Sequence, residues 1–333
     1  MSFQETTSTT SGLKFGSTHY PIHSGEILFV KSVKDGIPNR DPLNDSNARR
    51  LFGEDDGRIS LSDVSIKRDV RDYVLDRYPD GGEAKNNFVF VRPEYDENGK
   101  LLNRDKLAQS ILKRVGEKDA NKTQAEALFR ACFDMRVFGA VFSVSQKSFH
   151  ETGPVQFGWA HSLHPVETKY VQGTVAMPSD EGKAQGTVWT TYTLPFAVFA
   201  MPAIINAPLA AKTGASAADI DLLLEGLWRG TLHRQARGRG IQQPLLLIHV
   251  EYTDPFYRLG YLDEKIHLNP GREVWLGPKP PTTVGEVDLD LTRLSDELQA
   301  AQRQGLIARI RYWAYPDLKV KGTVPGEAQP LWR

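Results

Sequence analysis

Positively charged side chains gather in two short stretches of this 333-residue chain. The first holds Lys67, Arg68 and Arg71, and the second, over 233–240, carries three arginines among glycines. Arginine can bind a phosphate group through two parallel hydrogen bonds, and glycine lets a backbone approach a ligand closely. The chemistry that these two stretches indicate is phosphate binding, and a nucleic acid is the partner that they favour.

The first stretch falls at the start of a predicted helix. Ser60 and Asp63 have the spacing of a capping box, and the apolar residues that follow repeat with helical spacing, so we expect a helix over 61–78. An apolar strand at 27–33 precedes it and leads into a polar loop that contains Asn39 and Arg40. A strand, a polar loop and a helix N-terminus with cations beside it form a good site for a phosphate backbone.

Both stretches also have an ordinary interpretation. Lys67 and Arg68 could form a solvated helix face, and 233–240 could be a solvated loop after a helix. The chain carries 41 cations and 41 anions, so its formal net charge is zero. A strongly electrostatic nucleic-acid binder is usually basic, which counts mildly against nucleic-acid binding, although the distribution of charge matters more than its sum. A chain that assembles with itself also benefits from carrying both signs.

Composition excludes several other classes. Cys132 is the single cysteine, so neither an internal disulfide nor a cysteine-built metal site is expected. His161 and His164 are three apart, but no further ligand follows at a convincing spacing, so we expect no metal and no cofactor. Neither a phosphate-binding P-loop nor a nucleophile elbow occurs. Because no signal peptide and no membrane-spanning run are present, a cytoplasmic location without membrane contact is expected.

The order of predicted elements indicates an α+β fold. Strands and helices alternate as βαββαβ, which is the ferredoxin-like or RNA-recognition arrangement. The predicted core elements are the strand 27–33, the helix 61–78, the strands 137–144 and 155–159, a helix starting at Ser216 and the strand 245–250. Helices near 105–115 and 123–135 form an insertion after the first core helix. Two alternating runs, 168–177 and 187–193, predict a protruding β-hairpin, and a helix near 291–302 and a strand near 306–315 lie in the tail.

The chain resembles the backbone subunit of CRISPR Cascade complexes, the seventh Cas family of the repeat-associated RNA-binding (RAMP) superfamily, in its type I-B and I-C branch. The matching segments follow one another in the family's order over roughly 25–252: Glu26 to Asp45, Ser62-Asp63-Val64, Lys67-Arg68, Asp134 to Ala140, Thr152 to Phe157, His164 to Glu167, Ala236-Arg237-Gly238 and Leu245 to Glu251. The resemblance implies a palm (25–84, 136–165 and 196–255), helical fingers (85–135), a thumb hairpin (166–195) and a C-terminal extension (256–333).

The resemblance also implies a function. The chain would be a non-catalytic subunit that holds CRISPR guide RNA for pairing with target DNA, in several copies and with other Cascade subunits. The residues expected to contact RNA are Asn39, Arg40, Arg58, Ser62, Lys67, Arg68, Arg71, His164, Met177, Arg234, Arg237 and Arg239. Met177, at the root of the hairpin tip, could wedge against a base.

Two other interpretations remain open. Related type III subunits cleave target RNA with a loop aspartate, and Asp41 lies in the corresponding loop, so the chain could be a RAMP ribonuclease. A carboxylate at this place could equally cap a turn or pair with Arg40. A stand-alone RNA-binding protein of the same fold, without assembly, is the third interpretation.

Overall fold

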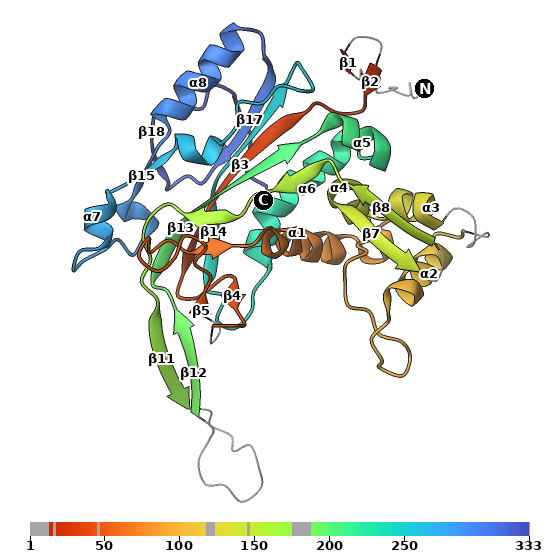
Figure 1. Cartoon of the computed structure of the whole chain (residues 1–333), viewed down its shortest axis with the longest axis horizontal. Coiled ribbons are helices and arrows are strands. Elements are labelled where there is room, and N and C mark those ends of the chain that lie inside the picture. Colours follow the sequence, from red (N-terminus) through yellow and green to blue (C-terminus); the bar gives the residue numbers. More distant parts are fainter. Residues whose placement is uncertain are drawn as a thin grey trace, which may run out of the picture.

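The computed structural model describes residues 13–15, 18–44, 47–117, 124–144, 147–174 and 188–332. In these residues an eight-stranded sheet has the order β19-β17-β14-β3-β13-β10-β6, and β9 also pairs with β13 (Figure 1). Its strands, in chain order, are β3 Gly25–Lys34, β6 Ser60–Leu61, β9 Val155–Phe157, β10 Ala160–Ser162, β13 Phe196–Ile205, β14 Ile241–Tyr252, β17 Ile307–Ala314 and β19 Glu327–Ala328.

The remaining elements surround this sheet. The helices are α1 Asp63–Arg77, α2 Arg104–Arg114, α3 Gln124–Ala131, α4 Phe133–Phe138, α5 Ala207–Thr213, α6 Ala217–His233, α7 Arg272–Trp275 and α8 Thr292–Arg303, with 3-10 turns at Pro79–Gly81, Leu262–Lys265 and Val284–Glu286. The strands outside the sheet are β1 Leu13–Phe15, β2 Thr18–Tyr20, β4 Arg40–Asp41, β5 Asn47–Ala48, β7 Gly139–Val144, β8 Lys147–Thr152, β11 Lys169–Thr174, β12 Val188–Thr193, β15 His267–Asn269, β16 Asp288–Asp290 and β18 Lys319–Lys321.

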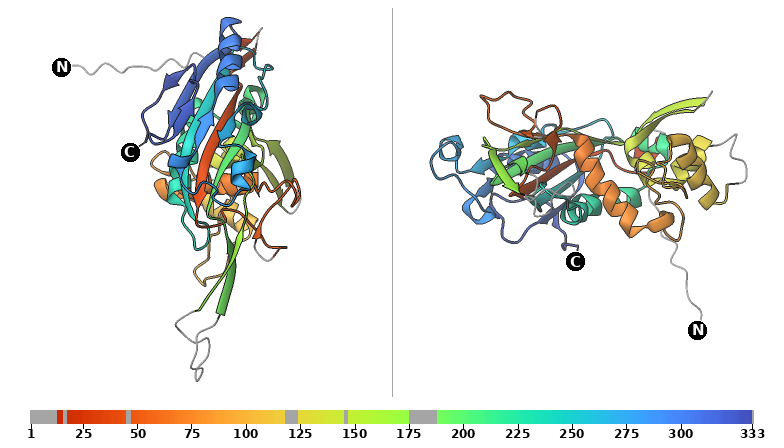
Figure 2. Two further views of the ribbon diagram at one scale, coloured as in Figure 1. Left: turned by 90° about the vertical axis from the view of Figure 1, so that its left-hand side faces the viewer. Right: turned by 90° about the horizontal axis from the view of Figure 1, so that it is seen from below.

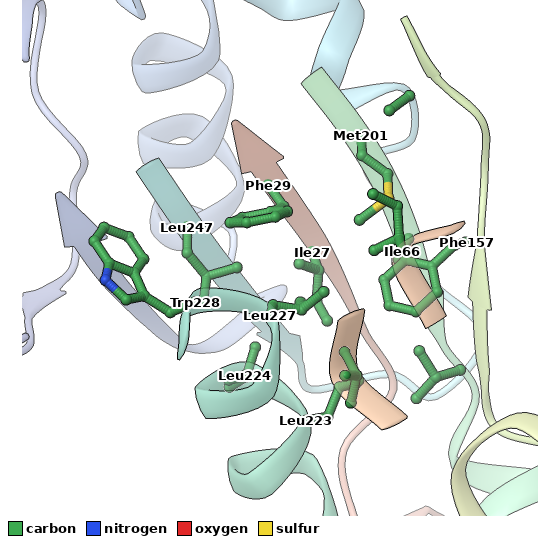
Figure 3. Packing of buried hydrophobic residues seen from close by; sticks show 14 of the residues in the cluster. Ile27, Phe29, Ile66, Phe157, Met201, Leu223, Leu224, Leu227, Trp228 and Leu247 are labelled. Carbon is green, nitrogen blue, oxygen red and sulfur yellow. The ribbon is translucent and has the colours of Figure 1, made fainter. Parts of the chain in front are cut away.

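Strand β3 lies at the centre of the sheet, with β13 on one side and β14 on the other, both antiparallel to it. Its side chains alternate between two hydrophobic clusters. Ile27 and Phe29 pack with α1 and α6 (Figure 3), and Leu28 and Val30 pack with the C-terminal part of the chain, including α8. Because both faces of this strand are buried, residues 27–30 form a continuous apolar run instead of alternating with polar residues.

A third, separate hydrophobic cluster holds the region around α2 and α3 together. It contains Phe88, Leu107, Ile111, Leu128 and Met135 among its buried members. The helices predicted near 105–115 and 123–135 are present, but the second breaks at Cys132 into α3 and α4. Figure 1 shows these helices and the β7/β8 hairpin at one end of the molecule, away from α7 and α8.

The predicted hairpin is also present. Strands β11 and β12 pair antiparallel from Lys169↔Thr193 to Thr174↔Val188 and project from the body of the molecule (Figures 1 and 2). Its tip, 175–187, lies outside the described residues, and so does Met177.

One predicted core strand is wrong. We expected a strand over 137–144 in the main sheet, but Val137 and Phe138 end α4, and β7 pairs with β8 in a two-stranded sheet of its own. Gly139, with φ of 81°, separates the helix from the strand, and a Cβ there would lie 2.3 Å from the carbonyl oxygen of Glu151. The pattern of apolar residues showed a strand but not which strand it would pair with.

The sequence analysis also missed a central strand, β13. Pro202 interrupts its apolar run, and proline usually argues against a central strand because it has no N–H to donate. In the structure Pro202 lies between the residues of β13 that pair with β10 and those that pair with β9. Its carbonyl accepts a hydrogen bond from Gly158 N at 2.8 Å. The N–H group that Pro202 lacks therefore falls at the gap between β9 and β10.

The start of α1 differs from the prediction as well. The helix begins at Asp63 with Ser62 as its N-cap, and Ser60 belongs to β6, so Ser60 and Asp63 form no capping box. By contrast, the helix predicted from Ser216 has a complete capping box between Ser216 and Asp219.

Candidate nucleic-acid interface

The polar loop after β3 is fastened to the first turn of α1. The Asn39 side-chain oxygen accepts hydrogen bonds from both the backbone N–H and the hydroxyl of Ser62, each at 2.9 Å. Because the Ser62 hydroxyl is used in this way, it does not cap the helix. The loop and the positive end of the α1 dipole are thus held side by side, as the sequence analysis expected.

The next residue, Arg40, points toward the hairpin. Its Nη1 donates to the Thr191 hydroxyl at 2.6 Å, and its Nη2 donates to the carbonyl oxygens of Tyr192 and Gly238 at 3.3 and 3.1 Å. Arg40 therefore joins the loop after β3, strand β12 and the glycine-rich stretch 234–240.

Arg68 is the most open of the three α1 cations that were expected to contact RNA. Its Nε lies 2.6 Å from Asp72 Oδ1, and 36% of its side chain is exposed. Lys67 is largely covered, with its Nζ 2.9 Å from Asp63 Oδ2. Both are i,i+4 pairs on a helix surface, which contribute only a few tenths of a kcal/mol (~0.3–0.5) each, so a competing phosphate can replace them at small cost.

Arg71 lies inside the protein. Its Nε donates to Asp134 Oδ2 at 2.9 Å, and the same carboxylate accepts from the backbone N–H groups of Phe90 and Val91. Contact with RNA would require Arg71 to leave the Asp134 carboxylate, so the burial of Arg71 argues against the expected contact. Arg71 instead connects α1 to α4 and to the segment that leads to α2.

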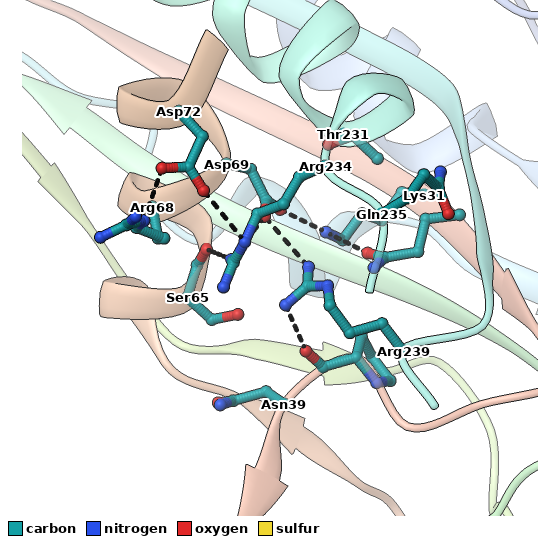
Figure 4. Close-up of polar contacts among 12 residues, drawn as sticks. Lys31, Asn39, Ser65, Arg68, Asp69, Asp72, Thr231, Arg234, Gln235 and Arg239 are labelled. Carbon is teal, nitrogen blue, oxygen red and sulfur yellow. Dashed lines mark hydrogen bonds and ion pairs between the residues drawn. The ribbon is translucent and has the colours of Figure 1, made fainter. Parts of the chain in front are cut away.

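The second cationic stretch is organised around a buried carboxylate, Asp69 of α1 (Figure 4). Lys31 Nζ lies 3.2 Å from Asp69 Oδ2, and Arg234 and Arg239 donate to Asp69 Oδ1 at 2.8 and 3.0 Å. Arg234 also pairs with Asp72. Burial lowers the pKa of Lys31, and the Asp69 charge opposes that shift. Four cations, Lys31, Arg68, Arg234 and Arg239, face the two carboxylates of Asp69 and Asp72, which leaves an excess of positive charge between β3, α1 and the stretch 234–240.

These contacts fix the course of the stretch 234–240. Arg234 donates to the carbonyl of Ser65 in α1, and Arg239 donates to the carbonyl of Pro38 in the loop after β3. Two cationic stretches separated by more than 150 residues of sequence thus meet in one place. Of the three arginines, Arg237 alone is exposed, and its guanidinium lies 4.7 Å from the centre of the Trp189 ring in β12.

Arg58 and His164 lie apart from this group. Arg58 binds Asp56 at 2.7 Å and lies 4.1 Å from the centre of the Phe52 ring, next to His161. His164 is buried and stacks on Trp275 at 3.4 Å. Burial lowers its pKa to about 4, so its ring is neutral at pH 7 and accepts a hydrogen bond from Val198 N. His164 therefore has no exposed surface with which to make the expected RNA contact, whereas Arg58 is partly exposed.

Asp41 makes the contacts of a turn residue. Its Oδ1 accepts from Leu43 N at 3.1 Å and lies 3.9 Å from Arg49 Nη1, so its cationic neighbour is Arg49 and not Arg40. Within the described part of the chain, no group of three or more histidine, cysteine, aspartate or glutamate side chains is placed to hold a metal ion. No helix in that part is long and apolar enough to cross a membrane.

Sequence reasoning missed Asp69, Lys31 and Trp189. A lysine in the middle of an apolar strand was the available signal for the first two, because a buried charge needs a partner of opposite sign. Trp189 gave no such signal, since the arginine that covers it comes from a distant loop.

Comparison of the sequence with known proteins identifies one family. The family model "CRISPR-associated protein Cas7" matches residues 23–292. A CRISPR-associated protein Cas7 of Haloferax volcanii is 28% identical over 301 residues, covering 84% of this chain and 83% of that protein. Two solved structures share the fold at 15% identity: a CRISPR RNA-guided surveillance complex, pre-nicking (TM-score 0.56, covering 93% of this chain and 96% of that one), and a CRISPR RNA-guided surveillance complex (TM-score 0.52, 93% and 95%).

Proposed function

Because the chain belongs to the CRISPR-associated protein Cas7 family, we propose that it is a guide-RNA-binding subunit of a type I, I-B/I-C-like, surveillance complex. Several copies line one CRISPR RNA, together with other subunits of a Cascade assembly, in the cytoplasm. The subunit is not an enzyme. It grips the RNA backbone and leaves the bases free to pair with target DNA.

The observation that carries this proposal is the meeting of the two cationic stretches. The loop after β3, the start of α1 and the stretch 234–240 are tied together by Asn39, Asp69 and Arg239, and their charges sum to a positive excess. Contacts to phosphate hold a nucleic acid in place without reading its sequence. A guide carrier requires this property, because each CRISPR RNA has a different sequence.

Exposure divides ten of the twelve expected contact residues into two groups; Met177 lies outside the described residues, and Arg40 is bound to the hairpin and to the stretch 234–240. We assign direct RNA contact to the exposed or partly exposed cations and to the loop that lies beside them: Asn39, Arg58, Ser62, Lys67, Arg68, Arg234 and Arg237. Arg71, His164 and Arg239 hold these elements in position from the interior.

We further propose that the chain is a ferredoxin-like palm with additions. Antiparallel strands in the order β14-β3-β13-β10, with α1 and α6 on one face, correspond to the 4-1-3-2 order of that fold. The palm comprises 25–84, 136–165 and 196–255, the fingers 85–135, the thumb 166–195 and the C-terminal extension 256–333. The third hydrophobic cluster supports the fingers as a unit.

The proposal can be tested by adding complementary DNA to the protein bound to single-stranded RNA. If the protein binds only the backbone of the RNA, the DNA pairs with the bound RNA, and a ternary species appears on a native gel. Two RNAs of unrelated sequence and equal length bind equally well. Displacement of the protein by the DNA, or a strong preference between the RNAs, would contradict the proposal.

A further inference from the structure

Arg40 connects the loop after β3 to the hairpin strand β12 and to the stretch 234–240. Its guanidinium group donates to the Thr191 hydroxyl, to the Tyr192 carbonyl and to the Gly238 carbonyl, at 2.6, 3.3 and 3.1 Å. Two of these acceptors are on hairpin strand β12 and one is on the stretch 234–240. A planar guanidinium suits this task because its donors point in several fixed directions at once.

Trp189 adds a second contact between the same parts. Its ring lies against Gly173 of β11, where an added Cβ would be 2.4 Å from the indole. The Arg237 guanidinium lies 4.7 Å from the centre of the ring, within the range of a cation–π interaction. Trp189 and Thr191 are two residues apart on one strand and therefore share a face of the hairpin, which is turned toward Arg40 and Arg237.

The backbone is shaped to allow this approach. Ile37 N donates to the Gly238 carbonyl at 2.9 Å, and Asp35 N and Gly36 N donate to Pro195 and Leu194 at the base of the hairpin. Gly238 has φ of 77°, and a Cβ there would lie 2.4 Å from Arg40 Nη2. A side chain at this position would be strained and would also push Arg40 away from its acceptors.

We propose that Arg40, Trp189, Arg237 and Gly238 form a latch that fixes the angle between the β11/β12 hairpin and the body of the protein, and that Arg40 is a positioning residue of this latch instead of an RNA contact. The consequence for RNA rests on the proposed function: a hairpin held at a fixed angle sets the spacing of successive subunits along the guide. The contacts of the latch all lie within one chain.

The latch can be tested without RNA, by measuring the distance between spin labels at Thr174→Cys on the hairpin and Lys212→Cys on α5. Burial raises the pKa of the Cys132 thiol, so labels attach to the introduced cysteines only. A narrow distance distribution is expected in the parent protein and a broad one after Arg40→Gln, Arg40→Lys or Trp189→Ala. Trp189→Phe should restore the narrow one, because it keeps an aromatic ring. Arg303→Gln, which removes an exposed arginine on α8, is the matched control and leaves the distribution narrow.

A salt titration with an unstructured single-stranded RNA separates positioning from phosphate binding. Arg40→Gln should leave the slope of log K against log salt unchanged, whereas removing a cation that binds a phosphate lowers the slope by about 0.7. A lower slope for Arg40→Gln but not for Arg40→Lys would mean that Arg40 binds phosphate and would overturn the inference, with the proposed function intact. Distributions that stay narrow in folded Arg40→Gln and Trp189→Ala would overturn the latch as well. Failure of the parent protein to bind RNA would contradict the proposed function and leave the latch standing.

Discussion

At the scale of single residues, the cations around α1 fall into two groups, according to whether the carboxylate that each one faces is buried or at the surface. Asp69 and Asp134 are buried and hold Lys31, Arg239 and Arg71 in the interior. Asp63 and Asp72 are at the surface of α1 and bind Lys67 and Arg68 through short, local ion pairs. An incoming phosphate can replace the surface pairs at little cost, whereas removing one partner of a buried pair costs about 3–5 kcal/mol. Among these cations, RNA contact therefore belongs to the second group and to Arg234, which faces Asp72 as well as Asp69.

The double variant Lys67→Ala with Arg68→Ala tests this assignment. It should stay folded, because it removes only two surface ion pairs. It should bind RNA more weakly and with a smaller dependence on salt, by about 0.7 in the slope of log K against log salt for each phosphate that is no longer bound. Fluorescence anisotropy over a salt series measures the slope. Arg293→Ala with Arg303→Ala on α8 is the control, and an equal slope in all three proteins would refute contact at Lys67 and Arg68.

A second residue-scale prediction concerns Asp41. Its carboxylate accepts a hydrogen bond within its own turn and faces Arg49, so it is occupied as a turn residue. We expect both the parent protein and Asp41→Ala to leave complementary target RNA uncut in magnesium, with the guide bound. Cleavage by the parent that disappears in Asp41→Ala would favour the ribonuclease interpretation.

At the scale of elements, the sequence predicted the helices and loops whose structure depends on residues close together in the chain. The helix of Ala217–His233 was predictable from its capping box and apolar periodicity, and the loop 38–42 and the stretch 234–240 from charge and glycine content. Pairing partners could not be predicted in this way. The residues of β7 had the pattern of a core strand but pair with β8, and β13 was concealed by Pro202. Asp69 and Trp189 likewise owe their roles to partners that only the fold brings near.

The hairpin is the element whose function is easiest to isolate. Replacing residues 175–185, between β11 and β12, by a short Gly-Ser turn should leave the protein folded, because connections between secondary-structure elements tolerate insertions and deletions. If the hairpin is a thumb, the shortened protein loses the regular spacing of subunits on the guide and exposes the RNA between them to nuclease. Footprinting of assembled complexes reads the spacing. A footprint period equal to that of the parent would make the hairpin an ordinary surface excursion.

At the scale of the whole molecule, zero net charge and RNA binding are compatible because the charges are unevenly distributed. Positive groups beside α1 outnumber the carboxylates that face them, whereas other acidic groups such as Asp55 and Asp296 lie elsewhere in the chain. The tail completes the same body: β17 pairs with β14, and Trp332 stacks on Trp313 with 4.8 Å between ring centres. The family model ends at 292, so nearly all of α8, and β17 and β19, lie beyond the matched region. A neutral subunit can add to a growing row without overall repulsion between copies.

The central claim is that several copies line one RNA, and native mass spectrometry tests it most directly. The parent protein is mixed with single-stranded RNAs of increasing length and its copies per RNA are counted. The proposed function predicts a copy number that rises in regular steps with RNA length. One copy per RNA at every length, with the protein otherwise monomeric, would contradict it and favour a stand-alone RNA-binding protein.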